Sequence, residues 1–101
     1  MKANFQSVNF NADKKLLEFI QSKLDKLDQL YDKILSKEVY LKVENASDKA
    51  NKLVEIKLHL PGRELMVKKQ THSFEQAADR AVEALRRKVK KEKEKSRAVG
   101  V

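Results

Sequence analysis

The spacing of the apolar residues changes twice along this chain, and these changes restrict the folds that it can adopt. From residue 13 to about residue 32 the apolar residues recur every three or four positions, as in a helix that buries one stripe. From residue 36 to 69 they alternate with polar residues, as in strands that bury one face. The helical spacing returns at residue 73. We therefore expect a group of strands that is flanked in the sequence by two helices.

The alternating region divides into three expected strands. They cover residues 38–44, 54–60 and 64–69, with a polar connection at residues 45–51. Pro61 and Gly62 form a tight turn between the second and the third of them. Because the connections are short, the three strands should form an antiparallel meander with one apolar face, and the two helices must cover that face.

The first helix is expected to begin after Asp13, whose side chain can accept a hydrogen bond from the first turn, and to end near Asp32. Before it, residues 2–10 should form a strand of imperfect alternation with a bulge near Asn9. A chain of 101 residues is long enough for one core. We predict a single α+β domain over residues 1–97, in the order β-α-β-β-β-α with a four-stranded sheet, and a short tail at residues 98–101.

The second helix should begin at Ser73, because Gln76 three residues later completes a capping-box pattern. Its apolar stripe stops at Val89, and the next positions on that face are Glu92 and Lys93. A helix that continued to residue 97 would be about 36 Å long, whereas a seven-residue strand spans roughly 23 Å. Its basic end should therefore project beyond the sheet. The stripe consists of Phe74, Ala78, Ala81, Val82, Leu85 and Val89.

The positive charge of the chain is concentrated in this second helix. The formal net charge is +8, and the segment from Arg80 to Arg97 holds nine Lys or Arg residues against three acids. Such an excess favours a polyanionic partner, although charge alone does not distinguish RNA, DNA, anionic lipid and an acidic protein. There is no cysteine, and no apolar run exceeds three residues. We expect a cytoplasmic protein without a membrane span or signal peptide.

Helical geometry separates these cations by direction. Placing residues 100° apart around the helix, with Leu85 facing the core, turns four cations away from the core and puts Arg86 and Lys88 on its flanks. This spacing suits phosphates along a groove, and binding would then depend strongly on salt. The alternative is a solvated helix end in which Glu83 pairs with its basic neighbours. The four outward cations are Arg80, Arg87, Lys90 and Lys91.

No pattern in the sequence predicts catalysis, a metal site or a cofactor. His59 and His72 are the only histidines, and neither lies in a metal-binding spacing or beside an evident nucleophile and oxyanion site. Asp25, Asp28 and Asp32 lack the loop pattern of a calcium site, so we expect them to be solvated carboxylates. We predict that the protein is not an enzyme.

Four segments together resemble one known family. They are KLDKL (23–27), VYLKVE (39–44), VEIKLHLPG (54–62) and AADRAVEALRRKVKK (77–91). In their order and spacing they resemble the bacterial ribosome hibernation-promoting factors and ribosome-associated inhibitors, the sigma-54 modulation protein family. The resemblance implies a fold like that of double-stranded-RNA-binding domains, with both helices on one face of the sheet. It also implies binding to ribosomal RNA in the small ribosomal subunit, over the decoding region, where the protein would inhibit translation.

The resemblance extends to individual positions. It implies RNA contacts by Lys23 in the first helix, with Lys26 as a secondary candidate. The chain departs from the family at Glu75 beside Phe74, where an aromatic residue is frequent. We expect a short-type member, without the second domain of long members, that is monomeric in isolation. In the second helix the implied contacts are Arg80, Arg86, Arg87, Lys90 and Lys91, and Lys88 is a secondary candidate like Lys26.

Two other functions would explain the same charge. One is a general module for double-stranded RNA with no role at the ribosome. The other is a docking segment for a membrane or a protein, which would need a free apolar helix face. That face is narrow and rich in alanine, so we expect it to be committed to the sheet and expect no membrane partner.

Overall fold

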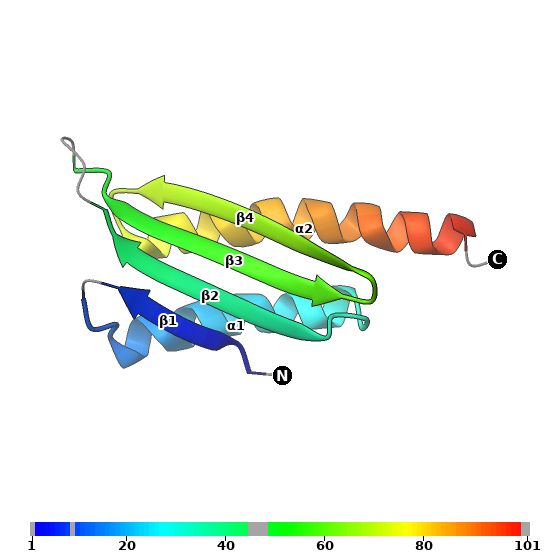
Figure 1. The fold of residues 1–101 in the computed structure, drawn as a ribbon, viewed down its shortest axis with the longest axis horizontal. Coiled ribbons are helices and arrows are strands. Elements are labelled where there is room, and N and C mark those ends of the chain that lie inside the picture. Colours follow the sequence, from blue (N-terminus) through cyan, green and yellow to red (C-terminus); the bar gives the residue numbers. More distant parts are fainter. Residues whose placement is uncertain (1, 9, 45–48, 100–101) are drawn as a thin grey trace.

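The computed structural model describes residues 2–8, 10–44 and 49–99, with side chains to Lys95. The order of elements is the predicted β-α-β-β-β-α, and both helices lie on the same face of a four-stranded sheet (Figure 1). The expected bulge at Asn9 falls outside the described residues. The likeness to double-stranded-RNA-binding domains stays a prediction. The elements are β1 (Asn4–Val8), α1 (Lys14–Leu30), β2 (Ser36–Val43), β3 (Lys52–Leu60), β4 (Arg63–Thr71) and α2 (Phe74–Val99).

The strands lie in sequence order across the sheet, β1-β2-β3-β4. The β2, β3 and β4 strands form the predicted antiparallel meander, with Val39 opposite Ile56 and Ile56 opposite Val67. Gly62 closes the β3–β4 turn with φ +77°, a conformation that favours glycine. The β1 strand pairs with β2 in parallel, because α1 connects the two strands as a crossover.

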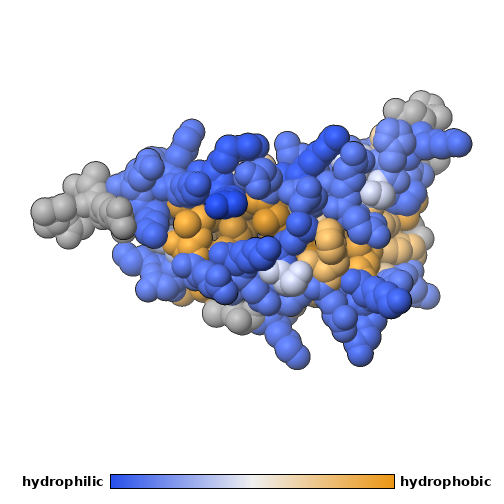
Figure 2. Space-filling model, turned by 180° about the vertical axis from the view of Figure 1, so that it is seen from behind, coloured by the Kyte–Doolittle hydropathy of each residue, from blue (hydrophilic) through white to orange (hydrophobic). Residues whose placement is uncertain are grey.

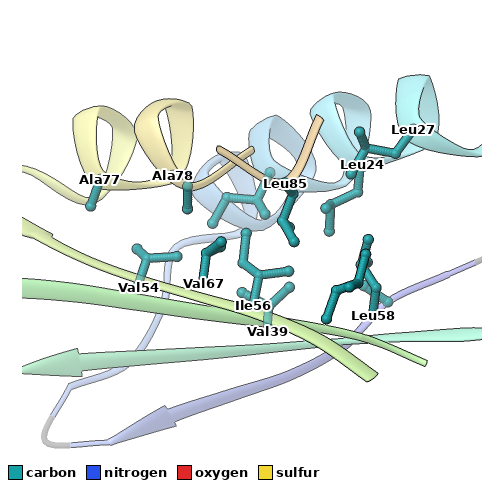
Figure 3. Packing of buried hydrophobic residues seen from close by; sticks show 14 of the residues in the cluster. Leu24, Leu27, Val39, Val54, Ile56, Leu58, Val67, Ala77, Ala78 and Leu85 are labelled. Atoms are coloured by element: carbon teal, nitrogen blue, oxygen red, sulfur yellow. The ribbon is translucent and has the colours of Figure 1, made fainter. Parts of the chain in front are cut away.

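The core lies between the sheet and the two helices (Figure 3). Val39, Ile56 and Val67 contribute from three adjacent strands, and Leu24 of α1 and Leu85 of α2 meet them from above. Every one of the five is nearly or fully buried. The two helices run in the same direction across the sheet (Figure 1), so α1 ends near the β3–β4 turn and α2 continues past it.

The predicted helix starts are confirmed. The Asp13 side chain accepts a hydrogen bond from the backbone N–H of Lys15 at 3.0 Å, and the Ser73 hydroxyl accepts one from the N–H of Gln76 at 3.1 Å. The Ser73 N–H donates to the Thr71 hydroxyl at 3.4 Å. The α2 helix continues to Val99, so the first two residues of the expected tail are helical.

The core-facing side of the sheet contains a charged side chain whose burial was not predicted. Lys37 of β2 shares the core-facing side of the sheet with Val39, and its side chain is 0% exposed. Its ammonium forms an ion pair with Asp28 of α1. The expectation that Asp28 is a solvated carboxylate was therefore wrong. The alternation of β2 turns Lys37 inward, and a buried ammonium needs a polar partner. The Asp28 carboxylate is that partner.

In the described parts of the chain, neither helix has a stretch that is both long enough and apolar enough to cross a lipid bilayer.

Candidate nucleic-acid interface

The apolar stripe of α2 is committed to the sheet, as predicted. Ala78, Ala81, Leu85 and Val89 are fully buried. These residues hold the helix in one rotation about its axis, so the direction of each cation up to Val89 follows from helical geometry. The docking of this face onto a membrane would require its release from the core.

The cations of α2 form two rows on its exposed side. Arg86 lies on the flank that faces α1, where it lines a groove between the helices, and Lys90 follows it one turn later. Arg80, Arg87 and Lys91, at spacings of seven and four residues, lie in a second row that is turned away from α1. All five side chains are exposed, and none forms an ion pair with an acid in the described part of the chain.

Lys88 differs from the cations of the two rows because its side chain contacts the sheet. Its ammonium donates to the backbone carbonyl of Met66 at 3.3 Å, on the outer edge of β4. The lysine is exposed, but this hydrogen bond holds it at the sheet edge and away from the second row. Of the predicted α2 residues, Lys88 is thus the one whose side chain bonds to another element of the described fold.

The groove between α1 and α2 has an apolar floor and a charged rim. Leu27, Leu30 and Val82 line it together with charged residues from both helices. Figure 2 shows hydrophobic side chains exposed along the middle of this face of the molecule, between polar side chains above and below them. The charged residues of the rim are Lys23, Lys26, Asp79, Glu83 and Arg86.

Lys23 reaches across this groove. Its ammonium donates to Asp79 of α2 at 2.7 Å and lies 5.0 Å from the ring centroid of Phe19. The hydrogen bond from Lys23, and then its charge, lower the pKa of Asp79. The Lys23 side chain is 26% exposed and that of Asp79 67%. Lys23 therefore joins the two helices and is partly neutralised, whereas the five cations of the two rows on α2 form no ion pair within the described residues.

The charge of α2 changes sign along its length. Residues 74–85 contain one arginine and three acids, and residues 86–95 contain seven cations and two acids. Arg80 therefore lies in the acidic part of the helix sequence, whereas Arg87 and Lys91 lie in its cationic part. If this helix end were only a solvated terminus, Glu83 would pair with Arg80 or Arg87. Within the described residues it forms neither ion pair.

Two contacts that sequence reasoning missed lie beyond the apolar stripe. Arg63 of β4 pairs with Glu92 at 2.8 Å, and the Lys93 ammonium donates to the backbone carbonyl of Leu30, at the end of α1, at 3.2 Å. The signal was present in the sequence, because Glu92 and Lys93 occupy the positions that continue the buried stripe after Val89. Their partners could not be identified from spacing alone.

The open face of the sheet carries the remaining titratable cluster. His59 contacts Glu38 at 2.5 Å and Glu64 at 3.2 Å. The hydrogen bond with His59 lowers the pKa of Glu38, and the charges of His59 and Lys57 act in the same direction against the effect of burial. In the part of the chain that the structure describes, no group of three or more His, Cys, Asp or Glu side chains is placed to hold a metal ion.

The fold is a four-stranded sheet with one helical layer, and the described part of α2 in that layer presents two rows of exposed cations. A sequence profile described as "Sigma 54 modulation protein / S30EA ribosomal protein" matches residues 3–97. The chain therefore belongs to this family of ribosome-associated proteins, which are not enzymes, and the predicted family is confirmed.

Individual proteins agree with the family. A protein of Pseudomonas putida named ribosome hibernation promoting factor is 28% identical over 99 residues, which cover 98% of this chain and 93% of that protein. The N-terminal domain of Thermus thermophilus Protein Y has a similar structure, with a TM-score of 0.77, 26% identity, and coverage of 90% of this chain and 98% of that one. A ribosomal subunit interface protein of Coxiella burnetii, at 18% identity, shares the fold with a TM-score of 0.81 over 92% of this chain and 98% of that one.

Proposed function

We propose that this protein is a hibernation factor that binds the small ribosomal subunit in the cytoplasm and inhibits translation by occupying the decoding region. The observation that carries the proposal is the double row of exposed cations on α2, which form no ion pair within the described residues and lie on a helix that the buried stripe holds against the sheet. The name of the Pseudomonas putida relative supports a role in hibernation, and that of the Coxiella burnetii protein supports a place at the subunit interface.

The cations that would contact ribosomal RNA are those of the two rows, together with Lys23. RNA helices are recognised mainly through their shape and phosphates, so these side chains would act without reading a sequence. A rigid body of this kind would gain specificity from fitting a preformed ribosomal cleft. Lys88 would contribute from the sheet edge, and Lys23 would contribute where the two helices meet. The candidate contacts are Lys23, Arg80, Arg86, Arg87, Lys88, Lys90 and Lys91.

Cosedimentation with purified small subunits at two salt concentrations tests the proposal. The wild-type protein should pellet with the subunits, and binding should weaken steeply as salt increases, because phosphate contacts release counterions. Changing Arg86, Arg87, Lys90 and Lys91 to glutamate should abolish binding. A matched variant with the same change in net charge, at the exposed residues Lys2, Lys15, Lys49 and Lys68, should bind much more tightly than this one.

Two results would contradict the proposal. If the α2 variant binds small subunits as tightly as the wild-type protein, the basic helix is not the interface. If the wild-type protein binds arbitrary duplex RNA as tightly as it binds the subunit, it is a general RNA-binding module. The location over the decoding region has its own test, since the bound protein should prevent transfer RNA from binding to programmed small subunits.

A further inference from the structure

The basic half of α2 extends beyond the part of the helix that the core holds. The buried stripe ends at Val89, and α2 then continues for ten residues to Val99. Figure 1 shows this end of the helix projecting beyond the β3–β4 turn. Lys90 and Lys91 lie just past the last buried residue. Their direction therefore depends on contacts other than apolar packing.

Glu92 provides the first of these contacts. It lies three residues after Val89, on the same face of the helix, and its side chain is only 11% exposed although the surrounding segment is strongly charged. Both of its carboxylate oxygens face one nitrogen of Arg63, at 2.8 and 3.2 Å. Arg63 is the first residue of β4 and lies opposite Leu60 of β3 in the hairpin, across the turn that begins at Pro61. The ion pair therefore connects α2 to the rigid end of the hairpin.

An acid at this position opposes the charge that the proposed function requires. Glu92 lies beside Lys91 and Lys93 in a segment that would face phosphates, and a carboxylate there lowers the attraction for a polyanion. The gain in stability from a partly exposed ion pair is generally small. The ion pair of Glu92 with Arg63 acts mainly on the orientation of the helix segment that carries Lys90 and Lys91.

We infer that Glu92 and Arg63 are positioning residues for RNA binding: their ion pair holds the segment after Val89 against the hairpin and so fixes the direction of Lys90 and Lys91. This inference rests on the proposed function. Holding these side chains in place before binding reduces the entropy that is lost when they contact phosphates. Lys93, which donates to the end of α1, supports the same segment from its other side.

The substitution Glu92→Ala separates positioning from simple electrostatics, because the two make opposite predictions. It raises the net charge by one and replaces glutamate with the best helix former, so electrostatics and helix propensity both favour tighter RNA binding. The positioning role predicts weaker binding to small subunits, by roughly threefold or more. Glu94→Ala is the matched control, since Glu94 is exposed on the solvent side of the same segment and the charge change is identical.

Two further variants test the pair itself. The double variant Arg63→Ala, Glu92→Ala has the net charge of the wild-type protein, and its binding should be about as weak as that of Glu92→Ala alone, because either change breaks the same ion pair. The exchanged variant Arg63→Glu, Glu92→Arg keeps both the net charge and the opportunity for an ion pair. It should bind small subunits nearly as tightly as the wild-type protein does.

The measurement is equilibrium binding of the full chain to purified small subunits over a series of salt concentrations, with amide hydrogen exchange on the free proteins. Glu92→Ala should have a shallower salt dependence, by roughly one unit of slope for each phosphate that the variant no longer neutralises. Exchange should increase at residues 90–95 and stay unchanged in β2 and β3.

The outcomes distinguish this inference from the proposed function. If wild-type protein binds small subunits and Glu92→Ala binds as tightly or more tightly, as Glu94→Ala is expected to, the positioning role is overturned and the proposed function stands. Unchanged amide exchange at residues 90–95 in Glu92→Ala also overturns it. If wild-type protein does not bind small subunits at all, the proposed function fails, and increased exchange would then support only the anchoring of the helix end.

Discussion

Lys37 offers the sharpest test of what holds this fold together. Its side chain is 0% exposed and pairs with Asp28, which is 30% exposed. The substitution Lys37→Ala removes three methylene groups from the core, at about 0.8 kcal/mol each, and takes this partner away from Asp28. Breaking a buried pair costs about 3 to 5 kcal/mol. Because Asp28 remains accessible to water, we expect the free energy of unfolding to fall by about 3 kcal/mol, at the lower end of this range.

Lys37→Met separates the packing of the lysine stem from its charge. Methionine fills a similar volume, and the remaining Asp28 carboxylate is 30% exposed, so water can solvate it after it loses this partner. We expect Lys37→Met to remain within about 1 kcal/mol of the wild-type protein. The difference between the two variants measures how much of the contribution of Lys37 comes from its apolar stem.

Urea denaturation followed by far-UV circular dichroism is a suitable assay, since the chain contains no tryptophan. With a slope of about 1.5 kcal/mol per molar urea, a loss of 3 kcal/mol lowers the midpoint by about 2 M. A loss for Lys37→Met as large as that for Lys37→Ala would refute the reasoning, because it would show that the ion pair and not the packed stem provides the stability. A loss below about 1 kcal/mol for Lys37→Ala would refute the burial of the side chain.

Three further predictions concern other parts of the chain. Leu85→Ala should lower the free energy of unfolding by about 2 to 5 kcal/mol in the same urea assay, because Leu85 is fully buried, and a loss below about 1 kcal/mol would mean that α2 does not pack as described. Ser73→Ala should cost about 1 kcal/mol through loss of the hydrogen bond to the N–H of Gln76, whereas Ser73→Asp, which can accept the same bond, should cost much less. The lowered pKa of Glu38 contributes stability that is present above the unfolded pKa of about 4.3 and is lost as the pH falls through the lower folded value. Urea midpoints should therefore fall less steeply below pH 5 in Glu38→Gln than in the wild-type protein, and parallel curves would contradict this role for the hydrogen bond with His59.

Much of the fold could be predicted because its signals are local. Alternation from Val54 to Leu60 determined which side of β3 is buried, since successive side chains of a strand point to opposite faces. Asp13 and Ser73 marked the helix starts because a cap bonds to N–H groups two or three residues away. The exposed directions of Arg87 and Lys91 followed from the rotation of 100° per residue once Leu85 was placed in the core.

The charged partners could not be predicted, because the chain had to fold before they were near one another. Lys23 and Asp79 are 56 residues apart, Arg63 and Glu92 are 29 apart, and Lys93 lies 63 residues from the carbonyl it binds. A long charged side chain can reach several acids or carbonyls, and only the placement of the two helices on the sheet decides which of them is close. The sequence alone thus determined the elements, their buried faces and the cationic half of α2. Only the tertiary structure decided that Lys23 is partly neutralised by Asp79 and that the cationic helix end is anchored through Glu92.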